Sequence, residues 1–177
     1  IKINGDEIVE IGKRLRRSEE TEIFDAEERY VIPGFIDIHT NGSAGFDLSS
    51  GVYEAGKNRF IKSSSQYKKG LESALRFYLK TGTTKVLLSS VSAPFDQTVD
   101  NFSRVASFKQ EKPELADVLY GLYVEGLFIK DSNSRGAQNP KYFLKPVPAL
   151  ISQLRKSSRD LLKIINIPPE WGPEALR

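Results

Sequence analysis

The chain has 177 residues, of which 39% are hydrophobic and 28% charged, a balance typical of a soluble globular domain with its own core. Its 26 basic and 23 acidic residues leave a net charge of +3, which indicates a mixed surface and excludes a nucleic-acid footprint. No apolar stretch reaches the length of a membrane-spanning helix. The absence of cysteine excludes disulfides and Cys-ligated zinc sites, and it permits a cytoplasmic location.

The N-terminal part of the sequence favours short strands. Residues 1–12 alternate apolar and polar side chains around a Gly-containing turn, which predicts a β-hairpin. Residues 22–26 and 30–32 continue this pattern, so we expect residues 1–32 to form a small antiparallel sheet. A strand pattern that starts at Ile1, in a chain without methionine, indicates that the natural start is missing.

The most informative stretch runs from Val31 to Gly42, V-I-P-G-F-I-D-I-H-T-N-G. Phe35–Ile38 predicts a short buried strand, and His39, the only histidine of the chain, follows it directly. Two interpretations of His39 are open. It is either a metal ligand at the carboxyl end of a strand, where barrel enzymes place their chemistry, or a satisfied buried histidine beside a core strand. The Gly- and Ser-rich residues 42–51 predict a loop.

From residue 66 onward, amphipathic helices alternate with buried strands. Helices are expected over residues 66–80, 96–110 and 147–156, and strands over residues 83–90, 118–124 and 161–167. With the strand before His39, this makes four strands joined by helices, which predicts βα units and a parallel sheet. A closed (β/α) barrel has about twice as many strands. We therefore predict an α/β fold that is a partial (β/α) barrel.

Two further places carry candidate functional side chains. Glu125 directly follows the third strand of the series, where its carboxylate could bind a metal, although an ordinary turn carboxylate fits the same position. Because parallel strands end at one edge of the sheet, we expect His39 and Glu125 to meet at one rim. Asn41 lies two residues after His39 and so shares its face of an extended segment. Residues 135–140, R-G-A-Q-N-P, suit a sugar or phosphate, but equally a plain surface connection.

Together these motifs resemble a known family. Y-V-I-P-G-F-I-D-I-H-T-N-G resembles the first barrel strand of the amidohydrolase superfamily, which follows a small β-sandwich. G-L-Y-V-E-G-L-F-I-K, R-G-A-Q-N-P and N-I-P-P-E resemble the N-acetylglucosamine-6-phosphate deacetylase family, in register over essentially the whole chain. The resemblance implies a metal-dependent hydrolase with a TIM barrel, in which residues 1–32 are a β-sandwich segment and residues 33–177 the first half of the barrel.

The resemblance also implies a substrate, a cofactor and an assembly. The substrate is an N-acetylated amino-sugar phosphate, from which the enzyme removes the acetyl group. The cofactor is a divalent metal, zinc or iron, and the protein is a cytoplasmic homo-oligomer, a dimer. Neither a nucleic acid nor a membrane is an expected partner.

Individual positions carry the resemblance over to this chain. Glu125 matches the metal-ligating glutamate of the family, and His39 is a weaker second candidate for the metal. The positions that match substrate-binding residues are Asn41, Arg135, Gly136, Ala137 and Gln138. Three positions depart from the family: Asn41 replaces the second histidine of an H-x-H motif, Gln138 replaces a loop histidine, and Leu127 replaces a proline.

The resemblance further implies what these 177 residues lack. The later metal-binding histidines of the family and its catalytic aspartate lie on strands beyond the fourth, so no catalytic residue is assigned here. The chain alone is therefore expected to be inactive. Two hypotheses follow. The chain is the N-terminal half of a metal-dependent deacetylase, or it is a non-catalytic truncated relative that is stable only when another molecule completes the half-barrel.

Overall fold

The computed structural model describes residues 1–61 and 63–176. The chain divides into two compact units, Ile1–Pro33 and Gly34–Arg177. Every buried hydrophobic side chain among the described residues belongs to the second unit. The second unit therefore holds the hydrophobic core, and the first has none of its own.

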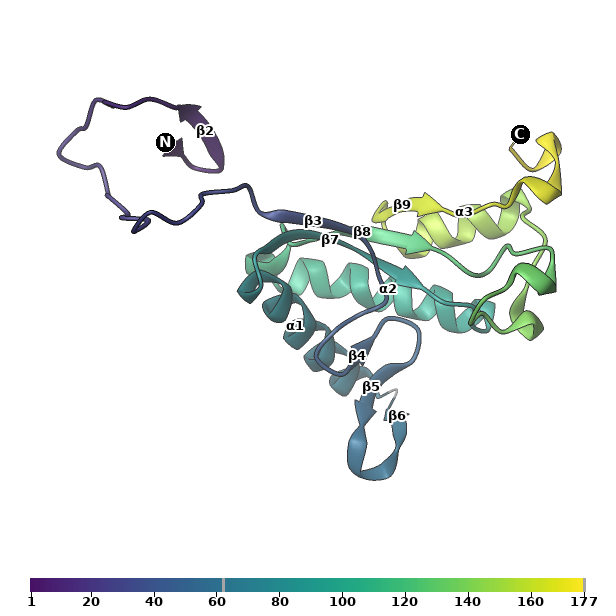
Figure 1. Ribbon diagram of the computed structural model, residues 1–177. Coiled ribbons are helices and arrows are strands. Elements are labelled where there is room, and N and C mark those ends of the chain that lie inside the picture. Colours follow the sequence, from purple (N-terminus) through teal and green to yellow (C-terminus); the bar gives the residue numbers. More distant parts are fainter. Residues whose placement is uncertain (62, 177) are drawn as a thin grey trace. The chain divides into compact units, whose positions relative to one another are not determined.

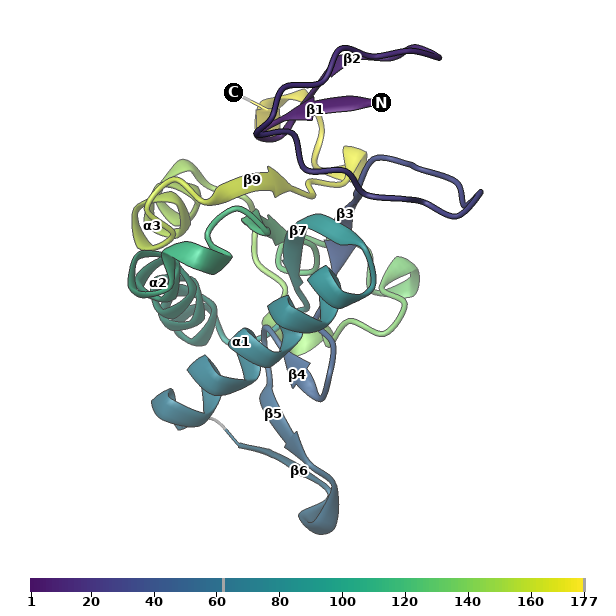
Figure 2. The ribbon, with the colours of Figure 1, turned by 90° about the vertical axis from the view of Figure 1, so that its left-hand side faces the viewer.

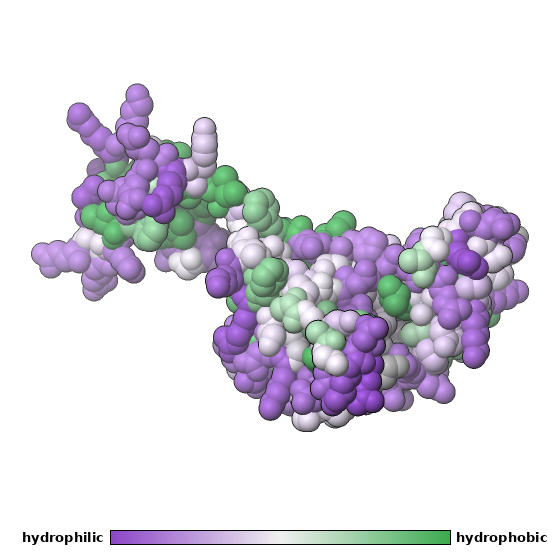
Figure 3. Space-filling model, turned by 60° about the horizontal axis from the view of Figure 1, so that its bottom comes forward, coloured by the Kyte–Doolittle hydropathy of each residue, from purple (hydrophilic) through white to green (hydrophobic). Residues whose placement is uncertain are grey.

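The first unit contains one antiparallel hairpin, formed by β1 (Lys2–Asn4) and β2 (Glu7–Glu10). The hairpin predicted from the alternating pattern is thus confirmed, but no strand forms over residues 22–26 or 30–32. A strand requires a neighbour for its backbone hydrogen bonds, and these segments have none within the described unit. Phe24 is accordingly 90% exposed, and Figure 3 shows hydrophobic residues gathered on the surface of this unit.

The second unit is built on a four-stranded sheet in which every pairing is parallel, as the alternating pattern predicts. Its strands, in spatial order, are β3 (Phe35–Thr40), β7 (Thr83–Ser90), β8 (Leu119–Val124) and β9 (Leu162–Ile165). Its helices are α1 (Ser64–Lys80), α2 (Phe95–Glu111) and α3 (Pro148–Ser157). Figures 1 and 2 show the three helices on one side of this sheet. No helix in the described residues is long and apolar enough to cross a membrane.

Local sequence signals explain where α1 begins and ends. The Ser63 side chain accepts a hydrogen bond from the Gln66 backbone N–H and caps the first turn. Gly82 takes a φ of +86° just after the last turn, a conformation that side chains disfavour. One face of the helix is buried against the sheet, and it carries Tyr67, Gly70, Leu71, Ala74, Leu75 and Tyr78.

The segment after β3 is more ordered than the sequence indicates. A three-stranded antiparallel sheet forms within residues 46–61, so the predicted loop over residues 42–51 is correct except at Phe46–Asp47 and Gly51, which are strand. Phe46 and Leu48 are buried in the same core as α1, and the Tyr67 hydroxyl donates to the Leu48 carbonyl at 2.7 Å. Burial also raises the pKa of Tyr67. The strands are β4 (Phe46–Asp47), β5 (Gly51–Glu54) and β6 (Arg59–Ile61).

β3 is an edge strand, and its apolar side chains are exposed. Phe35, Ile36 and Ile38 are 57%, 67% and 59% exposed, which contradicts the prediction of a buried strand. β3 pairs only with β7, and the helices cover one side of the sheet, leaving its other face without a helix among the residues described. Apolar strands that a closed barrel buries on both faces stay open in a partial one.

Candidate metal and substrate site

Three candidate side chains meet at the carboxyl ends of the parallel strands. His39 Nε2 lies 3.0 Å from Glu125 Oε2, although His39 lies on β3 and Glu125 directly follows β8, and these two strands are not neighbours. The Asn41 side-chain amide donates to the same Glu125 oxygen at 3.3 Å and to the Ser89 carbonyl at 3.0 Å. Glu125 thus has two polar neighbours, His39 near the end of β3 and Asn41 just after it.

The local geometry of β3 explains why His39 faces this rim. Thr40 points toward the helices, where its hydroxyl is hydrogen-bonded to that of Tyr78 at 2.6 Å. The pairing of β3 with β7 is irregular between Asp37 and Thr40, and the His39 side chain lies on the side of Glu125 and Tyr123, which it contacts. The Asp37 carboxylate accepts a hydrogen bond from the His39 backbone N–H at 3.0 Å, which fixes the end of the strand.

The environments of His39 and Glu125 differ from those of core residues. The side chain of His39 is 48% exposed and that of Glu125 24% exposed. The interpretation of His39 as a buried histidine is therefore wrong. A half-exposed imidazole beside a partly exposed carboxylate is open to a ligand from the uncovered face of the sheet.

Gln138, one of the predicted substrate-binding residues, is buried beneath the rim. Its side-chain carbonyl accepts a hydrogen bond from the Ser92 backbone N–H at 2.6 Å, and the Ser92 hydroxyl accepts one from the Asn139 backbone N–H at 2.6 Å. A Cβ added at Gly126 would come within 2.1 Å of Gln138 Oε1. Gln138 therefore joins the long loop after β8 to the connection between β7 and α2.

The other loop residues lie at the surface. Arg135, Gly136 and Ala137 are exposed, and Gly136 adopts a φ of +57° in the turn that precedes Gln138. No hydrogen bond or ion pair among the described residues joins Arg135 to His39 or Glu125. The structure thus brings Gln138 close to the residue that follows Glu125, and leaves the guanidinium of Arg135 on the outside of the loop.

The side chains at the rim do not complete a metal site. Within residues 1–61 and 63–176, no group of three or more His, Cys, Asp or Glu side chains could hold a metal ion. The rim supplies one carboxylate, from Glu125, and one imidazole, from His39. A catalytic zinc ion keeps three protein ligands. Glu125 and His39 alone are therefore too few, and a zinc site at this rim would need at least one further protein ligand.

Three residues of this site were not identified from the sequence. Tyr123 precedes Glu125 by two positions on β8, and its ring lies 4.9 Å from that of His39 at an interplanar angle of 65°. Ser89 offers its carbonyl to Asn41, and the Asn166 amide donates to the backbone carbonyl of Glu125 at 3.4 Å. The period-two alternation of strands is the signal that would have placed Tyr123 on the same face as Glu125.

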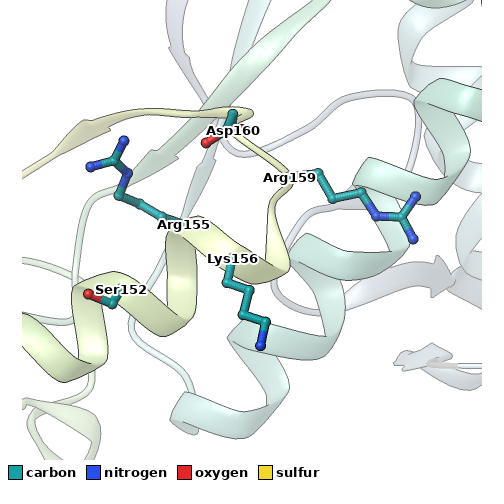
Figure 4. A pocket seen from close by; sticks show the side chains of 5 residues that line it. All are labelled: Ser152, Arg155, Lys156, Arg159 and Asp160. Atoms are coloured by element: carbon teal, nitrogen blue, oxygen red, sulfur yellow. The ribbon is translucent and has the colours of Figure 1, made fainter.

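A basic hollow lies elsewhere, on the helix side of the second unit. It is lined by Ser152, Arg155, Lys156, Arg159 and Asp160, at the end of α3. Figure 4 shows that the side chains of the three cations point away from one another. An anion site requires donors that converge. The hollow therefore does not provide a second candidate site.

A sheet of four parallel strands with helices on one side, and with a carboxylate and an imidazole paired at its carboxyl ends, is the arrangement of part of a (β/α) barrel. No family model matches the chain. Individual relatives nevertheless all point to one family, N-acetylglucosamine-6-phosphate deacetylase, which confirms the resemblance predicted from the motifs. The enzyme of this name from Lysinibacillus sphaericus is 30% identical over 149 residues, covering 80% of this chain and 32% of the relative. That from Vibrio furnissii is 26% identical, with the same coverage.

Solved structures of the same family share the fold. The deacetylase from Pasteurella multocida matches 81% of this chain with a TM-score of 0.62 at 20% identity, over 34% of its own length. A mutant of the Mycobacterium smegmatis enzyme, in complex with N-acetyl-D-glucosamine-6-phosphate, matches 78% of this chain with a TM-score of 0.58 at 21% identity, over 31% of its length. The chain thus spans about a third of the length of the relatives it matches.

Proposed function

We propose that the complete protein is a metal-dependent hydrolase that removes the acetyl group from an N-acetylated amino-sugar phosphate, such as N-acetylglucosamine 6-phosphate. The approach of His39 to Glu125 at 3.0 Å, at the carboxyl ends of a parallel sheet, carries this proposal. Barrel enzymes hold their catalytic groups at the carboxyl ends of their strands, and a carboxylate next to an imidazole at this edge supports the proposal. The names of the relatives supply the reaction. A cytoplasmic location, which the lack of cysteine permits, belongs to the same proposal.

Each candidate side chain has a role under this proposal. Glu125 would give a carboxylate oxygen to a divalent metal, zinc or iron, with His39 as a second donor or as a partner that orients Glu125. A divalent metal supplies Lewis-acid polarisation of a carbonyl and lowers the pKa of a bound water. The remaining ligands and the general base would come from residues outside this chain.

The loop after β8 would hold the substrate. Arg135 carries an exposed guanidinium, whose paired donors suit a phosphate or a carboxylate. Gly136 and Ala137 would offer backbone groups beside it. Because the carbonyl of Gln138 is already hydrogen-bonded to Ser92, its amide NH₂ is the group left for a sugar hydroxyl. Asn41 would contribute an amide at the rim itself.

A second candidate function is a non-catalytic relative. The observation that favours it is that no group of three metal-ligating side chains occurs among the described residues. The intact mass of the natural protein separates the two hypotheses. A mass near that of the relatives supports the enzyme, whereas a natural product of 177 residues supports the non-catalytic relative.

Acetate release tests the activity directly. The complete protein, loaded with zinc or with ferrous iron, is expected to release acetate from N-acetylglucosamine 6-phosphate and far less from N-acetylglucosamine. The phosphate provides charge-assisted hydrogen bonds that the unphosphorylated sugar lacks. Equal rates on the two sugars would contradict the proposed role of the loop, and no release from either would contradict the proposed reaction.

We also propose that the chain self-associates, as a dimer or a larger assembly. β3 and β9 are both edge strands, and three apolar side chains of β3 are more than half exposed. Exposed strand edges and apolar patches drive association. Sedimentation velocity on the 177-residue chain is expected to show species above the monomer, and Ile36→Lys combined with Ile38→Lys should reduce them. A monomer at all concentrations would refute the prediction.

A further inference from the structure

Tyr123 makes a ring contact with His39 that neither the motifs nor the proposed chemistry requires. The ring centroids are 4.9 Å apart, and the planes meet at 65°, an edge-to-face arrangement. Aromatic pairs favour this arrangement because the positive edge of one ring meets the negative face of the other. The contact therefore restrains the orientation of an imidazole that is otherwise half exposed.

The contact spans a strand that lies between the two residues. In the sheet, β7 separates β3, which carries His39, from β8, which carries Tyr123. Ser89 of β7 is paired in register with Tyr123, so their side chains point to the same face. The side chain of Ser89 is fully buried, and its hydroxyl has no hydrogen-bond partner among the described residues. A small residue at this position leaves room for the two rings to meet above it.

His39 is held between two partners, with the Tyr123 ring on one side and the Glu125 carboxylate at its Nε2 atom.

We propose that Tyr123 is a positioning residue that holds the His39 ring against Glu125, and that Ser89 permits this by being small. This proposal rests on the proposed function in one respect only: the His39–Glu125 pair serves the metal only if Glu125 is a metal ligand. The arrangement itself is a property of the chain. It can therefore be tested without metal, substrate or activity.

His39 is a convenient probe because it is the only histidine of the chain. With labelled histidine, each ring proton of His39 gives one assignable NMR signal. We expect a nuclear Overhauser effect between these protons and those of the Tyr123 ring. Tyr123→Leu should abolish that effect and shift the ring signals, whereas Tyr123→Phe should retain the ring-current shift. Ser89→Val should shift the signals with Tyr123 intact, because its extra bulk separates the rings.

A tyrosine on the same strand provides the matched control. Tyr120 is 52% exposed and faces Lys163 rather than His39, so Tyr120→Leu should leave the His39 signals unchanged. Far-ultraviolet circular dichroism separates loss of fold from loss of positioning. The proposal is overturned if Tyr123→Leu lowers the melting temperature but leaves the His39 signals in place. A failure of the deacetylase assay would leave this measurement unaffected, so the two failures are distinguishable.

Discussion

Glu125→Gln in the complete protein is expected to lower metal content and deacetylation together. Glutamine preserves the shape of the side chain but removes the charge that a divalent cation requires. Removal of groups that merely orient a ligand typically costs about 10- to 100-fold in metal affinity or activity. Loss of the proposed ligand should exceed that range. Metal content measured by mass spectrometry after dialysis, alongside acetate release, checks the prediction.

A glutamate outside the rim is the control for this experiment. Glu114 has a half-exposed side chain near Arg76 and Lys112, so Glu114→Gln should change neither metal content nor activity. In the 177-residue chain alone, Glu125→Gln should also change neither, because the rim offers too few ligands. Undiminished metal and activity in the complete Glu125→Gln protein would return Glu125 to an ordinary turn carboxylate.

The helices and parallel strands could be predicted because their signals are local. The apolar face of α1 repeats with the helical period, and Gly82 marks its end, so sequence spacing was enough to place the helix within two residues of its observed start. The parallel strands follow from the same alternation. The sheet of β4 to β6 could not be predicted in this way, because the burial of Phe46 and Leu48 depends on Tyr67, which comes later in the chain.

The sequence of β3 is more apolar than its surroundings in the described residues require. Phe35, Ile36 and Ile38 are typical of a strand buried on both faces, yet they are exposed. Hydrophobic patterning predicts burial on both faces of a strand, whereas the helices of residues 1–61 and 63–176 lie on one face of the sheet. The same reasoning applies to residues 22–26, whose strand pattern has no pairing partner within the first unit.

In the candidate site, too, some positions follow from the order of the strands and others depend on contacts between distant residues. His39 and Glu125 could be predicted to meet because the ends of parallel strands share one edge of a sheet, and this rule needs only the order of elements. The position of Gln138 could not, because it depends on a hydrogen bond to Ser92, 46 residues away. A motif position indicates the residue type that a loop carries, but not which of its atoms the fold already uses.

Gly126→Ala and Gln138→Ala are each expected to lower the free energy of unfolding. The double variant is expected to lose less than the sum of the two single losses. An alanine Cβ at position 126 would lie 2.1 Å from Gln138 Oε1 and 2.7 Å from the Ser92 backbone nitrogen. Overpacking of this kind costs about 1–3 kcal/mol. Gln138→Ala leaves the buried Ser92 N–H without its acceptor, which costs about 1–3 kcal/mol of the free energy of unfolding.

The combination tests whether Gln138 supports the loop or serves only the substrate. In the double variant the Gln138 side chain, with which the new Cβ would collide, is absent. Each single variant disturbs the same hydrogen bond between Ser92 and Gln138, so the double variant loses no more than that one bond. Urea unfolding should therefore give a coupling of about 0.5–3 kcal/mol between the two sites. Gln153→Ala, at an exposed position of α3, should change stability little and serves as the control. If Gln138→Ala leaves stability unchanged and the two effects add, Gln138 does not support the loop, and its role is confined to contact with the substrate.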